Sequence, residues 1–269
     1  MGVHFPFRWL IRRLERTARR ARLRRSWGLL RSFRWEQTRP ELFYGALAQD
    51  TAGMIAALSG DAGCGDLAGQ RVLDVGGGPG YFAAAFADRG AQYVAVEPDV
   101  GEMAAAGIAV PGAIRGSGMD LPIRSGCMDI AYSSNVAEHV DRPWRLGEEM
   151  LRVTRPGGLV VLSYTVWLGP FGGHETGLWA HYVGGAFAHD RYARRHGHPP
   201  KNVFGTSLFA VSCAAGLRWA EQVAAVGKAE VVGVFPRYHP WWAWWLVQVP
   251  VLREFAVSNL VIALKVPSA

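Results

Sequence analysis

The feature that most constrains the fold is the segment RVLDVGGGPG at residues 71–80. An apolar run of strand type leads directly into a glycine-rich loop, and the helix-like segment FAAAFADRG follows it. Glycine adopts positive φ without a steric penalty and lets a ligand approach the backbone closely. A strand, a glycine loop and a helix in this order predict an open α/β sheet that binds a ligand at the carboxyl edge of its strands.

The alternation continues along the chain and predicts a doubly wound α/β sheet with parallel pairing and helices on both faces. Glycines, histidines and aromatic residues interrupt the rhythm at 167–203, which predicts an insertion that closes over a substrate as a lid. Strands are expected at 93–99, 128–135, 159–167, 229–235 and 259–266, helices at 8–25, 101–108, 145–154 and 207–217, and a turn at 155–158.

Charge is concentrated at the N-terminus. Residues 1–25 hold nine arginines and one acid, Glu15, and so sum to +8, whereas the whole chain is +7 and the remainder is therefore −1. We expect a basic amphipathic helical extension at 1–60 and an α/β domain at 61–269, with the lid and a Trp-rich insertion at 236–256. A near-neutral body does not favour a nucleic-acid partner.

Cysteine content and hydropathy indicate the compartment. The three cysteines form no CxxC pair, which is typical of reduced thiols in a cytosolic protein. No run of 18 apolar residues occurs and arginines interrupt the N-terminal apolar run, so neither a spanning helix nor a secretory signal is expected.

The spacing of the loop glycines points to a nucleoside. A GxGxxG dinucleotide loop would have its third glycine at Tyr81, so the spacing here is GxGxG. Glu97 ends the next predicted strand, 17 residues after Gly80. A carboxylate at that strand end can accept hydrogen bonds from both hydroxyls of a ribose.

At this point the chain resembles the class I S-adenosylmethionine-dependent methyltransferases, of the type 11 kind. The resemblance lies in VLDVGGGPGYF, VAVEPD, GSGMDLPIRSGCMDIAYSSNVAEHV and EEMLRVTRPGGLVVLS and covers roughly residues 70–165, with weaker agreement through 204–266. It implies S-adenosyl-L-methionine as cofactor and a Rossmann-like seven-stranded sheet whose last strand is antiparallel. The excess of arginine over lysine, 26 to 3, is typical of a GC-rich, actinobacterial genome.

The resemblance also implies cofactor contacts. The family usually has an aspartate for the adenine amino group where Ser117 stands; Ser117 can accept one hydrogen bond, Met119 can pack on the ring, and Asp120 is an alternative acceptor. The implied set is Asp74, Gly76, Gly77, Gly78 and Gly80 around the methionine part, Glu97 and Pro98 at the ribose, Ser117, Gly118 and Met119 at the adenine, and Asn135 beside the cofactor.

Methyl transfer to a hydroxyl needs an in-line nucleophile and usually a base. The candidates are Glu138, His139, Tyr164 and His174, with His174 preferred among the lid histidines, although His139 can equally pack at a helix start. Some relatives in the family that this chain resembles have a Glu-x-x-Glu-His pattern here and bind a divalent metal, whereas this chain has Asn135 in place of the first glutamate, which leaves Glu138 and His139. The lid histidines lack zinc-like spacing. We therefore expect no metal ion.

Residues 238–252 carry four tryptophans and no formal charge. A helix of that length measures about 22 Å, short of the roughly 30 Å hydrocarbon layer. Tryptophan favours the interface between lipid and water, and two weak anchors, here 1–25 and 238–252, together bind a membrane stably. Core packing and a dimer contact are the alternatives for this segment.

These features predict a methyltransferase attached peripherally to the cytoplasmic face of the plasma membrane. Its acceptor would be a lipid, a glycolipid or another amphiphile, methylated at oxygen. The alternatives are a methyltransferase for a soluble small metabolite and a non-catalytic cofactor-binding scaffold protein.

Overall fold

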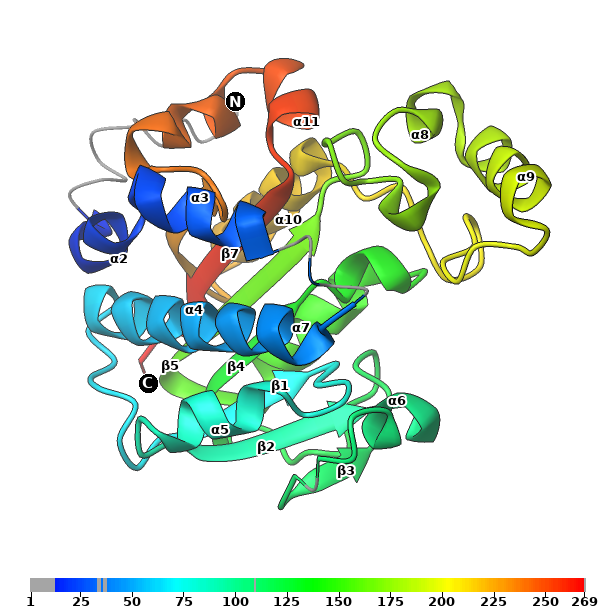
Figure 1. Ribbon diagram of the computed structural model, residues 1–269. Helices are drawn as coiled ribbons and strands as arrows, with labels where there is room; N and C mark the ends of the chain where they lie inside the picture. Colours follow the sequence, from blue (N-terminus) through cyan, green and yellow to red (C-terminus); the bar gives the residue numbers. More distant parts are fainter. Residues whose placement is uncertain (1–12, 33–34, 36–37, 109, 269) are drawn as a thin grey trace.

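The computed structural model describes residues 13–32, 35, 38–108 and 110–268. At its centre lies one seven-stranded sheet in the order β3-β2-β1-β4-β5-β7-β6 (Figure 1). The strands are β1 (Arg71–Val75), β2 (Gln92–Glu97), β3 (Ala113–Arg115), β4 (Met128–Ser134), β5 (Thr154–Thr165), β6 (Glu230–Pro236) and β7 (Asn259–Lys265).

The strand directions confirm the predicted architecture. β3, β2, β1, β4 and β5 pair in parallel, whereas β7 is antiparallel to both β5 and β6. In the register, Val75 lies beside Val96, and Asp74 beside Tyr132. The carboxyl ends of β1, β2 and β4 are therefore neighbours, which brings the glycine loop, Glu97 and Asn135 to one edge of the sheet.

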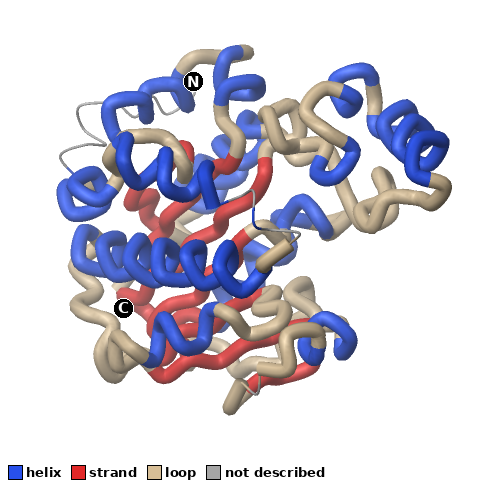
Figure 2. The backbone as a smooth tube through the Cα atoms, viewed as in Figure 1, coloured by secondary structure: helices blue, strands red, loops and turns tan. Residues whose placement is uncertain are grey.

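Helices cover both faces of the sheet (Figure 2). Strand residues alternate between two cores: Val72, Ile130 and Val161 face one, and Leu73, Ala131 and Val160 face the other. The first core is covered by α2 (Glu15–Arg20), α4 (Pro40–Asp61) and α5 (Phe82–Ala87), and the second by α7 (Pro143–Val153) and α10 (Cys213–Ala225).

The N-terminal region differs from the single helix predicted over 8–25. The prediction was wrong within the described residues, because α2 ends at Arg20 and α3 (Leu23–Ser32) begins after a break. Ala21 has a non-helical ψ of 65°, and its carbonyl accepts a hydrogen bond from Trp241 N–H at 2.8 Å. A tertiary contact from the far end of the chain therefore accompanies the break. Residues 8–12 of the predicted helix lie outside the described part.

Other predicted boundaries were also misplaced. The helix predicted at 101–108 ends at Ala104, in α6 (Val100–Ala104). The helix predicted from 207 begins only at Cys213, because Ser212 caps it by accepting from Ala215 N–H at 3.1 Å. The turn predicted at 155–158 lies within β5, where Gly157 donates to the carbonyl of Val266 at 3.0 Å.

Both insertions form compact helical segments. The lid consists of η3 (His174–Thr176), α8 (Ala180–Val183) and α9 (Gly185–His196), and it projects beyond the carboxyl edge of the sheet (Figure 1). The Trp-rich insertion forms the 3₁₀ helix η4 (Trp241–Gln248) and then α11 (Leu252–Ala256). In the described part of the chain, no helix combines the length and apolar character needed to cross a bilayer.

Candidate active site

The glycine loop after β1 requires glycine for two reasons, positive φ and close packing. Gly76, Gly78 and Gly80 have φ of 82°, 49° and 85°, in the region that favours glycine. A β-carbon at Gly76 would lie 2.3 Å from a methyl of Val136, and one at Gly80 would lie 2.2 Å from a methyl of Val110. A β-carbon at Gly78 would have no neighbour within 4 Å. The outer two glycines thus permit close packing, and the middle one leaves backbone open to a ligand.

Glu97 is held in place by backbone donors at the end of β2. Its Oε2 accepts from Gly78 N–H at 3.1 Å, and its Oε1 accepts from Asp99 N–H at 3.1 Å. An ionised carboxylate has about four lone-pair sites, so each oxygen keeps capacity for one more donor. The half-buried, oriented carboxylate fits the two hydroxyls of a ribose. Pro98, the next residue, is exposed.

Asp74 lies beneath the loop, not on its surface. It is 3% exposed, and its Oδ2 accepts from the hydroxyls of Tyr93, at 2.6 Å, and Tyr132. Burial raises the pKa of Asp74 to about 6, although the two tyrosine hydroxyls act in the opposite direction. Asp74 therefore supports the loop from below, and direct contact with the cofactor stays a prediction. Gly77 packs above it, because a β-carbon there would lie 2.8 Å from the Ala95 methyl.

The predicted adenine segment forms a tight turn. Ser117 Oγ accepts from Met119 N–H at 3.2 Å, and Asp120 N–H donates to the Ser117 carbonyl at 3.1 Å. A β-carbon at Gly118 would lie 2.4 Å from Leu146 Cδ1, so this position requires glycine. The turn is thus fixed against α7, with Ser117 and Asp120 exposed and Met119 partly so.

Asn135 directly follows β4 and has a left-handed conformation, φ 58°, which asparagine tolerates better than most residues. Its N–H donates to the Ser163 carbonyl at 2.8 Å, and its Oδ1 accepts from Asn259 Nδ2 at 2.7 Å. The next residue, Val136, contacts the glycine loop as described above. Asn259, which orients Asn135, was missed; its only signal was a polar residue at the start of an apolar strand.

A buried arginine beside this network was also missed. Arg237 is 1% exposed; its Nη1 donates to Ser134 Oγ at 2.6 Å, and its Nη2 donates to Thr51 Oγ1 at 2.5 Å. It joins the end of β6 to β4 and to α4. No local sequence pattern around residue 237 predicts a buried arginine there, because its hydrogen-bond partners are distant in sequence.

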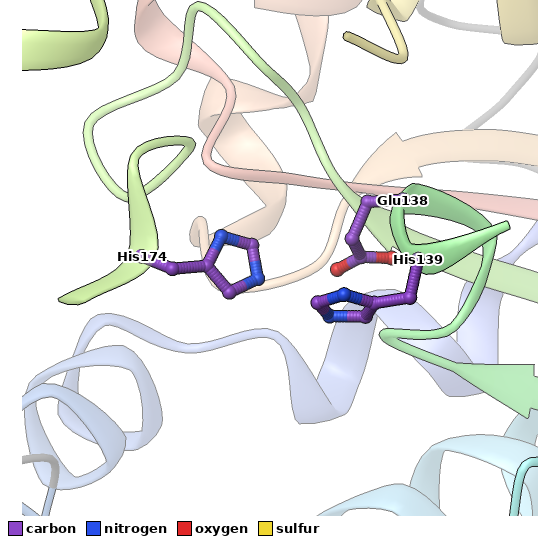
Figure 3. Close-up of side chains that lie close together, drawn as sticks. All are labelled: Glu138, His139 and His174. Carbon is purple, nitrogen blue, oxygen red and sulfur yellow. The ribbon is translucent and has the colours of Figure 1, made fainter. Parts of the chain in front are cut away.

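Three of the four catalytic candidates come together. Glu138 and His139 lie in η2 (Ala137–His139), just after β4, and His174 faces them from the lid (Figure 3). The rings of His139 and His174 have centroids 5.0 Å apart and are nearly perpendicular, at 81°. Burial lowers the pKa of His174, and Glu138 partly opposes this.

Tyr164, the fourth candidate, does not join this cluster. It is fully buried, and its hydroxyl donates to the Ser212 carbonyl at 2.9 Å. Burial also raises its pKa well above the ordinary value. Tyr164 therefore packs in the core, and the structure corrects its assignment as a group that meets substrate. The other lid histidines also lie elsewhere: His181 is buried against the Gly169 carbonyl, and His196 and His198 are exposed.

The arrangement suits group transfer at the sheet edge. The glycine loop and Glu97 offer one end of a site for a nucleoside. Val136 contacts that loop, and Glu138, the first member of the Glu138–His139–His174 cluster, follows Val136 by two residues along the chain. When bound, S-adenosylmethionine supplies a methyl group on an electrophilic sulfonium. The chain's own groups then have to hold an acceptor and its proton.

Comparisons with known proteins agree with this geometry. Residues 73–162 match a family described as "Methyltransferase domain". The chain is 62% identical over 254 residues to an uncharacterized methyltransferase of Mycobacterium marinum, covering 93% of this chain and 97% of the relative. It is also 62% identical over 251 residues to one of Mycobacterium tuberculosis, covering 92% and 96%.

Solved structures share the fold at low identity. A putative S-adenosylmethionine dependent methyltransferase from Listeria monocytogenes superposes with a TM-score of 0.52 at 14% identity, over 78% of this chain and 98% of that one. A second one, from Mesorhizobium loti, gives 0.50 at 18%, over 74% and 92%. With its glycine loop, the carboxylate of Glu97 at the end of β2 and its mycobacterial relatives, the chain belongs to the class I S-adenosylmethionine-dependent methyltransferases.

Proposed function

We propose that this methyltransferase methylates a hydroxyl of an amphiphilic acceptor, such as a lipid or glycolipid, while attached peripherally to the cytoplasmic face of a membrane. The observation that carries the proposal is a set of exposed apolar side chains on the N-terminal helices, the Trp-rich insertion and the lid. Its members are Leu23, Trp27 and Leu30 on α3, Trp241, Trp242 and Trp245 on η4, Val251, Leu252 and Phe255 at α11, and Leu178, Trp179, Tyr182 and Val183 at α8.

The two segments that looked amphiphilic in the sequence are neighbours in the fold (Figure 1). Besides the bond from Trp241 to Ala21, Arg25 Nη1 donates to the Arg237 carbonyl at 3.0 Å. Within η4, Trp244 is fully buried and stacks on Phe235, with ring centroids 4.4 Å apart. One tryptophan therefore anchors the segment in the core and leaves the other three available to an interface between lipid and water.

Charge complements these apolar side chains. Helix α3 contains no acidic residue, and Arg22, Arg24 and Arg31 are exposed in or beside it. The Arg31 guanidinium lies 5.2 Å from the centre of the Trp27 ring, which places a cation next to an exposed aromatic. Each arginine near an anionic bilayer contributes about 1 kcal/mol. The part of the proposed membrane-binding segment in residues 1–12 lies outside the described structure.

Part of this apolar set lies on the lid. Tyr182 of α8 and Phe255 of α11 have ring centroids 6.1 Å apart, so the lid meets the Trp-rich insertion. The same lid brings His174 to Glu138 and His139. An acceptor with its apolar chain in the bilayer would have a short path for its polar group to this cluster, which supports an amphiphilic acceptor over a freely soluble one.

A vesicle assay on the full chain tests the membrane proposal. We expect the protein to float with phosphatidylglycerol-containing vesicles and to lose this binding when Trp27, Trp242 and Trp245 are all changed to Ser. All three side chains are exposed, so melting temperature and S-adenosylmethionine affinity should be retained. The matched control is Val226→Ser, because Val226 is 69% exposed at the end of α10.

Transfer of label from methyl-labelled S-adenosylmethionine into a lipid extract tests the acceptor. Label in the organic phase, lost in the triple Trp variant and kept in Val226→Ser, supports the proposal. Label confined to aqueous products would favour a soluble metabolite. Tight cofactor binding with no label in either phase would favour a scaffold protein.

A further inference from the structure

The side chains of the Glu138–His139–His174 cluster are arranged as the ligands of a metal ion would be. Exchange of a proton among the three residues would not require this arrangement. One potential ligand atom from each residue lies within 4.8 Å of the other two. Figure 3 shows the His174 ring and the Glu138 carboxylate pointing toward one another, with the His139 ring beside them. Two of these groups come from η2 and the third from the lid, so the set exists only when the lid is in place.

Hydrogen bonds to backbone carbonyls fix both imidazoles. His139 Nδ1 lies 2.7 Å from the Ser207 carbonyl, and His174 Nδ1 lies 3.1 Å from the Gly172 carbonyl. A carbonyl oxygen only accepts, so each Nδ1 donates, and Nε2 is the nitrogen of each ring that is left for a ligand. Histidines that bind metals typically donate their other ring nitrogen to a carbonyl or carboxylate in this way.

The carboxylate has one oxygen without a partner. Glu138 is 1% exposed, and its Oε1 accepts from Thr165 N–H at 3.0 Å. Its Oε2 is buried and has no hydrogen-bond donor among the described residues. Leaving a charged acceptor buried and unpaired is costly. A cation at the centre of the cluster would remove that cost, which is an observation independent of the histidine geometry.

We propose that Glu138, His139 and His174 bind one divalent transition-metal ion of the zinc class. Two imidazole nitrogens and one carboxylate oxygen are the ligand set of catalytic zinc sites that keep a fourth position open. Two imidazoles favour zinc over the oxygen-preferring magnesium and calcium. Bonds of about 2.0–2.1 Å to a tetrahedral ion bring ligand atoms to about 3.3 Å from one another. Because the ligand atoms already lie within 4.8 Å of one another, no pair would have to approach by more than about 1.5 Å for binding.

The role of the ion, though not its binding, rests on the proposed function. In the open position it would hold the acceptor hydroxyl and lower the pKa of that hydroxyl, as it does for bound water. The proton leaves to solvent when the oxygen binds the ion. The ligands themselves then need not act as the base.

Cobalt(II) is the probe that tests the site without acceptor, vesicle or cofactor. After dialysis against a chelator, we expect the full chain to bind one Co²⁺, with a visible absorption band of tetrahedral type that one equivalent of Zn²⁺ abolishes. His174→Ala and Glu138→Gln should weaken Zn²⁺ binding in calorimetry by roughly a hundredfold or more. The matched control is His198→Ala, since His198 is an exposed lid histidine outside the cluster.

Two results would overturn the site: no Co²⁺ band in the wild type, or equal Zn²⁺ affinity in His174→Ala and wild type. Because His174 lies in the lid, its loss should leave the melting temperature of the metal-free protein unchanged, which separates lost binding from misfolding. A negative result in the metal titrations would not contradict the vesicle-binding and label-transfer tests of the proposed function. Failure of those assays likewise leaves the metal titration unaffected.

Discussion

Asp74 offers the sharpest test of how burial acts at this sheet edge. Its ordinary pKa of 3.8 is raised to about 6 by burial, which outweighs the two tyrosine hydroxyls that donate to it. Between these values the folded protein keeps a proton that the unfolded chain has lost. The resulting contribution to stability is fully present below about pH 4 and is lost as the pH rises through 6.

The gap between the two pKa values corresponds to about 3 kcal/mol. Asn in place of Asp74 removes the titration and keeps an oxygen that can accept from both tyrosines. We therefore expect the free energy of unfolding of Asp74→Asn, relative to wild type, to improve by about 3 kcal/mol between pH 4 and pH 8. Urea denaturation of both proteins, followed by tryptophan fluorescence without cofactor, measures this difference at each pH.

Asp129 supplies a contrast of opposite sign. Partial burial raises its pKa, but hydrogen bonds from Arg155 and Arg71 outweigh this and hold the pKa below its usual range. Its stabilisation is present above the unfolded pKa and is lost as the pH falls through the lower folded value. Asp129→Asn should thus lower the free energy of unfolding most at neutral pH and least in acid.

For Asp74, a difference in the free energy of unfolding between wild type and Asp74→Asn that stays constant from pH 4 to 8 would refute the claim that burial dominates there.

Five further substitutions test the glycine loop, the Trp-rich segment and Glu97. Gly80→Ala, whose β-carbon would lie 2.2 Å from a valine methyl, should lose about 1–3 kcal/mol from overpacking in urea denaturation, in addition to the left-handed strain of about 1–2 kcal/mol that it shares with Gly78→Ala. Equal losses in the two variants would contradict the packing difference. Trp244→Ala should cost about 3–5 kcal/mol because the side chain is fully buried, whereas Trp242→Ala, at 53% exposure, should stay within about 0.5 kcal/mol. Glu97→Ala should raise the S-adenosylmethionine dissociation constant in calorimetry roughly a hundredfold, as expected for losing charge-assisted bonds worth about 3 kcal/mol; an unchanged constant would show that the carboxylate does not hold the ribose.

Local pattern was sufficient for the parts of the site that lie at strand ends. The loop glycines, Glu97 and Asn135 each follow a strand that hydrophobic runs already marked, and parallel strands bring their carboxyl ends to one edge. Asn259 and Arg237 could not be found in this way. Their roles depend on β6 and β7, which reach the site only through the antiparallel return of the sheet.

The N-terminal break shows the same limit for secondary structure. Arginines at four-residue spacing favour a continuous helix up to residue 25, yet the chain turns at Ala21. The carbonyl there is bonded to Trp241, which lies more than two hundred residues away along the chain. A non-local hydrogen bond together with the burial of Ala21 outweighs helix propensity, which is a weak preference of a few tenths of a kcal/mol per residue.

The sequence by itself determined the doubly wound sheet, the glycine loop and the position of the Glu97 carboxylate at a strand end, because each depends on residues close together along the chain. Only the tertiary structure decided which tryptophans are buried, since a charge-free run carries no periodicity that separates Trp244 from Trp242. It also decided which histidine meets Glu138 and His139. The lid folds back over the strand ends and brings His174 to them, and a contact of that kind is set by packing between distant segments.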